Sequence, residues 1–137
     1  MSRRVPPGSV FRDKLAFSRA MRVGDLVQVS ATGPTDSEGA LVASGAYAQT
    51  RDVFRQIEEA LQALGLALKD VTRLRIYLRD YGQLDEILRA QHPLFDAHPP
   101  ACSVICVAGF HIEGMHVYIE AEAATARRGS DDPAAER

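Results

Sequence analysis

The side chains of this sequence that could do chemistry lie mostly in two segments near the C-terminus. Residues 100–108 contain Cys102, and residues 116–123 contain Tyr118 and Glu120. A thiolate attacks carbonyl and imine carbons, a phenol can relay a proton, and a carboxylate can position a water molecule for hydrolysis. Cys102, Tyr118 and Glu120 are therefore the candidate catalytic residues.

Each candidate also has an ordinary structural interpretation. The sequence places no histidine or other base beside Cys102, so packing as a small apolar residue is the favoured role of this side chain. Tyr118 has the amphipathic character of a tyrosine at a subunit interface, which is the favoured interpretation there as well. Glu120 could equally be the partner of an arginine, and the sequence leaves that choice open.

A candidate ligand-binding cation lies in the alternating segment 70–80. Arg75 projects from the polar face of this segment. A guanidinium suits an acidic ligand because it donates two parallel hydrogen bonds to a carboxylate. The alternative, which we prefer on sequence grounds, is a salt bridge between subunits that joins Arg75 to Glu120 or Glu122.

A hairpin, two helices and three further strands must position these side chains. Alternating apolar residues predict the strands, and apolar residues at steps of three and four predict amphipathic helices. Gly24-Asp25 supplies the hairpin turn, and Gly65 ends the first helix. Pro93 lies inside the second helix and indicates a kink or an end near His92. The expected strands are residues 17–23, 26–31, 70–80, 100–108 and 116–123, and the expected helices are residues 46–64 and 83–97.

This order of elements predicts an α+β domain in which both helices cover one face of a sheet. The opposite face then gathers Ser30, Arg75, Cys102, Tyr118 and Glu120, and it is a solvated surface, a subunit interface or a ligand cleft between subunits. The alternation assigns the helix-facing side to apolar and small residues: Val27, Val29, Ala31, Thr72, Leu74, Ile76, Leu78, Ser103, Ile105, Val107, Val117, Ile119 and Ala121.

The composition is that of one globular domain. With 137 residues, of which 46% are hydrophobic and 25% charged, the chain can bury a core without disulfides or metals. The formal net charge of -2 gives no general attraction to nucleic acid or to an anionic membrane. We expect an extended arm over residues 1–14, a single domain over residues 15–125 and a disordered polar tail over residues 126–137.

The cysteines and histidines form no recognised disulfide or metal pattern. Cys102 and Cys106 lie about 13 Å apart along a strand at about 3.3 Å per residue, which is too far for a disulfide. Free thiols agree with a reducing compartment, and residues 1–7 lack the apolar stretch of a secretory signal. We therefore expect a cytoplasmic protein that uses no metal or cofactor and has neither nucleic acid nor membrane as a partner.

Between about Phe17 and Ala123 the sequence resembles the Rid (YjgF-type) reactive-intermediate imine/enamine deaminase family. The order and spacing of five segments carry the resemblance: Val29-Ser30-Ala31-Thr32-Gly33, Ala60-Leu61-Gln62-Ala63-Leu64-Gly65, residues 70–80, Pro100-Ala101 and Ile119-Glu120-Ala121-Glu122-Ala123. The resemblance implies a chorismate-mutase-like fold with a mixed sheet, and a homotrimer with clefts between neighbouring subunits. Members of the archetypal subgroup hydrolyse enamines and imines, such as 2-aminoacrylate, to 2-keto acids and ammonia.

Three matched positions depart from the family pattern. Cys102 stands where the family has an arginine that holds the substrate carboxylate, Phe17 where a tyrosine is usual, and Tyr118 where a glutamate is often found if the preceding loop is one residue longer. Ser30 keeps the family residue. The resemblance thus implies a divergent member that binds a small enamine, imine or related acidic metabolite through Phe17, Ser30 and Arg75. The alternative is a non-catalytic trimeric module that binds a metabolite or a protein.

Overall fold

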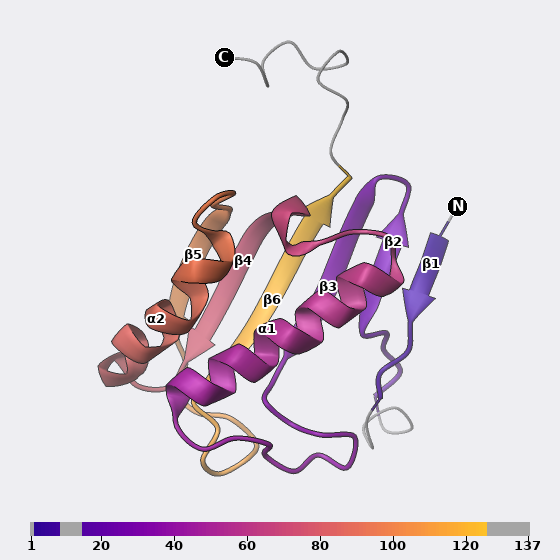
Figure 1. Cartoon of the computed structure of the whole chain (residues 1–137). Helices are drawn as coiled ribbons and strands as arrows, with labels where there is room; N and C mark the ends of the chain where they lie inside the picture. Colours follow the sequence, from indigo (N-terminus) through magenta and orange to yellow (C-terminus); the bar gives the residue numbers. More distant parts are fainter. Residues whose placement is uncertain (1, 9–14, 126–137) are drawn as a thin grey trace.

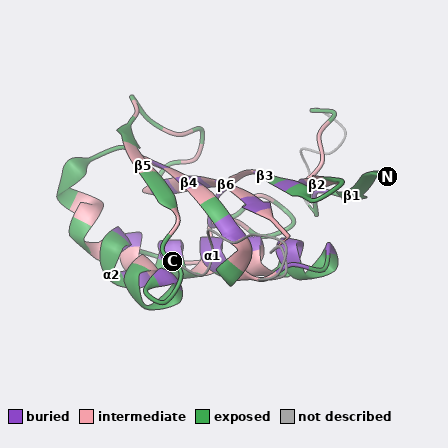
Figure 2. Cartoon of the chain, turned by 90° about the horizontal axis from the view of Figure 1, so that it is seen from above, coloured by how far each residue is buried: buried purple, intermediate pink, exposed green. Residues whose placement is uncertain are grey.

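The computed structural model describes residues 2–8 and 15–125 and arranges them in two layers (Figure 1). One layer is a six-stranded sheet of order β1-β2-β3-β6-β4-β5, in which β4 and β5 pair in parallel and all other neighbours antiparallel. Two helices lie together on one side of this sheet (Figure 2), which confirms the predicted α+β fold. The elements are β1 (Ser2–Val5), β2 (Ala20–Val23), β3 (Leu26–Thr32), α1 (Ala46–Ala63), η2 (Leu68–Asp70), β4 (Val71–Leu78), η3 (Tyr81–Gln83), α2 (Leu84–Phe95), β5 (Ala101–Cys106) and β6 (Val117–Ala124).

Helix α1 fills the centre of the core because its apolar residues recur at helical spacing. Val53, Ile57 and Leu61 are fully buried. The helix ends in a Schellman motif, in which Gly65 adopts a φ of 84° and the N–H of Leu66 donates to the Leu61 carbonyl at 2.9 Å. The predicted end at Gly65 is therefore confirmed.

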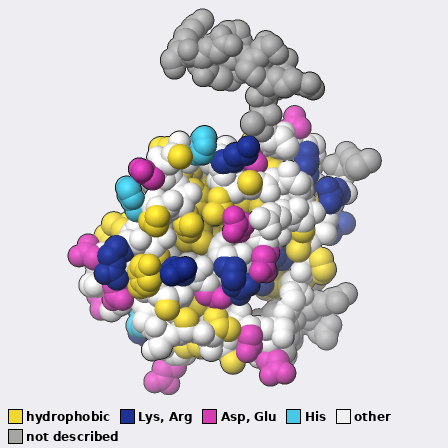
Figure 3. All heavy atoms as spheres, in the orientation of Figure 1, with side chains coloured by type: hydrophobic (Ala, Val, Ile, Leu, Met, Phe, Trp, Pro, Cys, Tyr) yellow, Lys and Arg dark blue, Asp and Glu magenta, His cyan; other side chains and the backbone are white. Residues whose placement is uncertain are grey.

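The outer side of the helix layer faces solvent and carries charges of both signs (Figure 3). On α1, Arg55 contacts Asp52 at 2.7 Å and Glu59 at 2.8 Å. Exposed pairs at these spacings stabilise a helix only weakly. Because the helices cover one side of the sheet, the other side is where a ligand or a second subunit can approach the strands.

The N-terminal residues extend the sheet. Ser2–Val5, expected in an extended arm, form the edge strand β1, which pairs with β2. Arg3 donates to the Ala63 carbonyl at 2.8 Å, and Arg22 of β2 donates to the Leu64 carbonyl at 2.7 Å. These guanidinium groups satisfy carbonyls at the end of α1 that lack helical partners. Residues 1 and 9–14 of the predicted arm, and the predicted tail after residue 125, lie outside the described residues.

Helix α2 continues through Pro93 to Phe95, so of the two effects expected of Pro93, a kink or an end near His92, the end does not occur. The N–H of Asp96 donates to the His92 carbonyl at 3.0 Å, which closes the last turn. Phe95 is buried and meets Phe54 of α1 edge to face, with ring centroids 5.2 Å apart. This packing holds the turn that Pro93 weakens.

Strand β3 contains a bulge that changes the faces of two residues. Val29 pairs with Ala121, but Thr32 pairs with Ile119, so β3 has one residue more than β6 over this interval. Thr32 is therefore fully buried, and Ala31, expected on the helix side, is half-buried at the edge of a cavity.

A similar irregularity changes the start of β4. The pairing of β4 with β6 shifts between Val71 and Arg73. Thr72, expected on the helix side, is exposed, and Val71 is buried in its place.

The faces of β5 are the reverse of those expected. In its parallel pairing with β4, Cys102 lies beside Leu74 and Val104 beside Ile76, and both partners belong to the core. Residues that pair on neighbouring strands share a face, so Cys102 lies on the helix side. The residues expected there, Ser103 and Ile105, lie on the open side, and Val107 follows the end of the strand.

Candidate functional site

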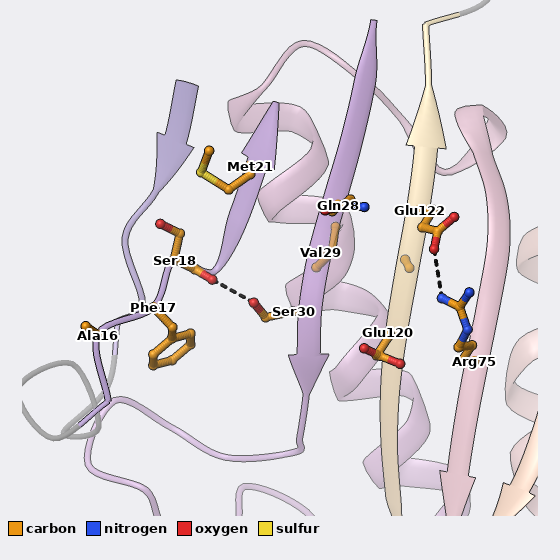
Figure 4. Close-up of a pocket in the computed structure, with 11 residues that line it drawn as sticks. Ala16, Phe17, Ser18, Met21, Gln28, Val29, Ser30, Arg75, Glu120 and Glu122 are labelled. Atoms are coloured by element: carbon orange, nitrogen blue, oxygen red, sulfur yellow. Dashed lines mark hydrogen bonds and ion pairs between the residues drawn. The ribbon is translucent and has the colours of Figure 1, made fainter. Parts of the chain in front are cut away.

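The open side of the sheet carries a first cavity of about 440 Å³, here called the sheet-face cavity (Figure 4). Phe17 precedes β2, Ser30 belongs to β3, Glu120 to β6 and Arg75 to β4, and all of them line it. Four of the six predicted site residues are thus brought together by segments that are distant in the sequence.

The ion pair at one side of this cavity involves Arg75. Its Nη1 lies 2.8 Å from Oε2 of Glu122, and both side chains are more than a third exposed. The hydrogen bond to Glu122 raises the pKa of Arg75. The salt bridge expected between subunits therefore forms within one chain.

Glu120 is held by a neighbouring phenol. The Tyr77 hydroxyl donates to Oε1 of Glu120, and this hydrogen bond is the main reason that the pKa of Tyr77 is raised. One oxygen of the Glu120 carboxylate is thereby held by Tyr77 of β4. The remaining lone pairs of the carboxylate can accept a proton from a ligand or a water molecule.

Ser30 presents an acceptor. Its hydroxyl donates to the Ser18 carbonyl at 2.7 Å, as the dashed line in Figure 4 marks. Because the hydroxyl proton is used there, the oxygen lone pairs remain to accept a hydrogen bond, for example from the N–H of a ligand.

A second cavity of about 530 Å³ adjoins the first beside the bulge of β3 and is here called the bulge cavity. Phe17 and Ser30 line both cavities, and Arg19, His111 and Tyr118 line the bulge cavity as well. A fifth predicted site residue, Tyr118, therefore lies next to the other four but in the second cavity.

Tyr118 is an anchored, neutral donor. Its ring stacks on His111 with centroids 6.2 Å apart and meets Phe110 edge to face at 5.7 Å. Burial raises the pKa of Tyr118, so the phenol keeps its proton at neutral pH. It can donate a hydrogen bond into the cavity.

Arg19 is a site residue that the sequence does not single out. Its side chain is half-buried, and Nη1 donates to the Thr32 hydroxyl at 3.3 Å. Burial lowers the pKa of Arg19, while the nearby Tyr118 phenol acts in the opposite direction. The available signal was its position two residues after Phe17 in an alternating segment.

Cys102 does not join these residues within one chain. It is exposed on the helix side of edge strand β5, where Nε2 of Gln91 donates to its Sγ at 3.7 Å. The expectation that Cys102 shares a face with Ser30, Arg75 and Glu120 is wrong.

The sequence places the protein among known families. The family model described as Endoribonuclease L-PSP matches residues 11–125. The chain belongs to this family. It is 32% identical over 121 residues to an uncharacterized protein of Streptomyces coelicolor, and the match covers 88% of this chain and 90% of the relative. It is 36% identical over 83 residues to the 3-aminoacrylate deaminase RutC of Acinetobacter baylyi, and the match covers 60% of this chain and 66% of the relative.

Solved structures support the same membership of the L-PSP family. A Mycobacterium tuberculosis member of the YjgF/YER057c/UK114 family has a TM-score of 0.80 and 35% identity, and the match covers 91% of this chain and all of that chain (100%). The yeast protein YEO7 has a TM-score of 0.81 and 26% identity, over 92% of this chain and 100% of that chain. The predicted YjgF-type fold is thus confirmed.

Two further findings concern the part of this L-PSP family chain that the structure describes. Residues 2–8 and 15–125 contain no group of three or more histidine, cysteine, aspartate or glutamate side chains arranged to hold a metal ion. Over the same residues, no helix is both long and apolar enough to cross a membrane.

Proposed function

We propose that this protein binds a small acidic enamine or imine in the two adjoining cavities and hydrolyses it to a 2-keto acid and ammonia. The observation that carries the proposal is that Ser30, Glu120 and Tyr118 line adjoining cavities with complementary hydrogen-bonding roles. The similarity to a 3-aminoacrylate deaminase supports the same class of substrate.

The proposed chemistry assigns one role to each side chain. Glu120, held by Tyr77, positions a water molecule, whose oxygen forms a bond to the imine carbon while a proton passes to the nitrogen. The resulting carbinolamine collapses: its hydroxyl proton passes through Glu120 to the amino nitrogen, the C–N bond breaks as the C=O bond forms, and ammonia leaves. Ser30 accepts the substrate N–H, and the neutral phenol of Tyr118 donates to the carboxylate or to the developing oxygen.

We propose that the active form is a cytoplasmic homotrimer with clefts between neighbouring subunits. Among the described residues, no helix covers the open side of the sheet, and Ile105 is 37% exposed there. Cys102 lies on the edge strand β5, so a catalytic or binding role for this thiol requires a neighbouring subunit. The exposed free thiols of Cys102 and Cys106 fit a reducing compartment.

The oligomeric part of the proposal is tested by light scattering coupled to gel filtration. The wild-type protein should have the mass of three chains, and Ile105→Glu should shift it towards the monomer because it places a charge in the contact. A monomeric wild-type protein would refute the trimer.

The catalytic part is tested by ammonia release from freshly generated 2-iminopropanoate and 2-iminobutanoate. Glu120→Gln should lower the rate by about 100-fold, the usual scale for a lost general base. Glu86→Gln on α2, far from both cavities, is the matched control and should keep the wild-type rate. A wild-type rate equal to that of buffer across both imino acids would refute hydrolysis.

The second candidate function is a non-catalytic module that binds an acidic metabolite. The observation that favours it is that the thiol of Cys102, at the position where the resemblance implies an arginine, contacts Gln91 on the helix side. This candidate predicts a rise in melting temperature with a 2-keto acid but no ammonia release. Turnover of either imino acid would exclude it.

A further inference from the structure

The bulge cavity contains a cation that the described residues do not neutralise. We infer that Arg19 binds the carboxylate of a small 2-imino or 2-keto acid in this cavity. The inference rests on the proposed function, because it specifies how the substrate of that same site is held. Arg19, on the segment that enters β2, then holds the substrate carboxylate. The resemblance implies an arginine at position 102 for this role, and this sequence has Cys102 there.

Three other arginines of the sheet have partners. Arg75 pairs with Glu122 at 2.8 Å, and Arg73 donates to the Ser103 hydroxyl at 3.2 Å. Arg22 donates to the carbonyls of Gly24 and Leu64.

Arg19, unlike Arg75, has a neutral hydrogen-bond partner and no carboxylate partner among the described residues. Among residues 2–8 and 15–125, no carboxylate lies within 4.0 Å of its guanidinium, which donates a hydrogen bond to the neutral hydroxyl of Thr32. It is thus a guanidinium with donors left for a ligand.

The acidic side chains that share a surface hollow with Arg19 have other partners. Asp36 and Glu59 line a neighbouring surface hollow together with Arg19. Asp36 accepts hydrogen bonds from the backbone N–H groups of Glu38 and Ala40, and Glu59 pairs with Arg55 at 2.8 Å. Neither is committed to Arg19.

The surroundings of Arg19 make an anionic ligand favourable. A half-buried cation has lost part of its hydration, which is why its pKa is lowered, and this loss is offset when a carboxylate enters the same site. A guanidinium can hold that carboxylate with two parallel hydrogen bonds. The neutral phenol of Tyr118 adds a donor and no negative charge.

The remaining walls define the rest of the ligand. Ser30 offers an acceptor suited to an imine N–H, whereas Phe17 and Leu15 offer apolar surface suited to a short alkyl chain. The volume of about 530 Å³ lies within the range of small-molecule sites. The ligand class is therefore a small 2-imino or 2-keto acid with an apolar side chain.

The test uses the stable product analogue 2-oxobutanoate and its uncharged amide, 2-oxobutanamide, in calorimetric titrations of the full chain. Wild-type protein should bind the acid at least about tenfold more tightly than the amide, because charged hydrogen bonds are the stronger ones. Arg19→Gln should abolish that preference, and Arg19→Lys should restore part of it. Arg79→Gln, which changes an exposed arginine directly after β4, is the matched control and should behave as wild type.

Several outcomes would overturn the inference. These are equal binding of acid and amide by the wild-type protein, unchanged binding by Arg19→Gln, or a loss caused by Arg75→Gln instead of Arg19→Gln. Melting temperatures of all variants exclude misfolding, and affinity for the acid should fall with added KCl in the wild type but not in Arg19→Gln. If binding depends on Arg19 but no imino acid is hydrolysed, the inference stands and the proposed hydrolysis fails.

Discussion

Gln49 on α1 ties together the two loops that border the bulge cavity, so its replacement should weaken both the fold and the site. The side chain is fully buried. Its Nε2 donates to the carbonyls of Ala43 at 3.2 Å and Gly114 at 2.8 Å, and its Oε1 accepts from the N–H of His116 at 2.8 Å. Leucine at this position fills a similar volume but makes none of these hydrogen bonds.

The magnitude follows from these three hydrogen bonds. Each hydrogen bond contributes about 1 kcal/mol, so Gln49→Leu should lower the free energy of unfolding by about 3 kcal/mol. The decrease is larger if no water molecule replaces the lost hydrogen bonds of the backbone groups. That is a large part of a total of about 5–15 kcal/mol, and it corresponds to about 10 °C in melting temperature.

Urea denaturation followed by circular dichroism measures this loss. Gln62→Ala is the matched control, because it changes an exposed glutamine of the same helix and should cost less than about 0.5 kcal/mol. A loss below about 1 kcal/mol for Gln49→Leu would show that the loops are held by something else. Binding of 2-oxobutanoate should weaken together with stability, because His111 belongs to the loop that Gln49 holds.

Three further predictions concern other parts of the structure. Burial raises the pKa of Tyr118 above its ordinary value of about 10, so with rising pH the unfolded chain loses this proton first and the free energy of unfolding falls above about pH 10. Tyr118→Phe should reduce that fall, measured by urea titrations at about pH 9 and about pH 11. An unchanged fall would contradict the burial argument. Cys102→Ser should keep ammonia release within about twofold of wild type, since the thiol lies on the helix side with Gln91, and a 100-fold loss would identify it as a nucleophile. Phe54→Ala should lower the free energy of unfolding by about 3–5 kcal/mol in urea titrations, because it leaves a cavity beside Phe95 in the core. A decrease of less than about 2 kcal/mol would mean that neighbouring side chains fill the cavity.

Much of the fold could be predicted because local patterns were unambiguous. The apolar spacing of α1 and the glycine at position 65 specify a helix and its end, and both are found in the structure. The alternation of β4 and β6 also places Arg75 and Glu120 correctly on one face, since every second residue there is strongly apolar.

The faces of β5 could not be predicted, for a physical reason. Its two alternating sets, Cys102 with Val104 and Ser103 with Ile105, are similar in polarity, so alternation gives no preference. The register with β4 decides the faces, and register is a property of pairing between distant segments. This is why alternation alone predicts the wrong side for Cys102.

Arg19 escaped prediction for a related reason. Its importance depends on which carboxylates lie near it, and the pairing of Asp36 and Glu59 with other groups is not visible in a linear sequence. The bulge that places Thr32 in reach of Arg19 has no glycine or other marker within the strand.

The bulge of β3 has a consequence for how this protein can diverge. Val29 and Thr32 face the core on either side of it, whereas Ser30 and Ala31 line the bulge cavity. Substitutions at the two inner positions can therefore change ligand preference while the flanking positions preserve folding. A lineage can explore new substrates here at little risk to stability, whereas deletion of one inner residue would restore even pairing and erase the cavity wall.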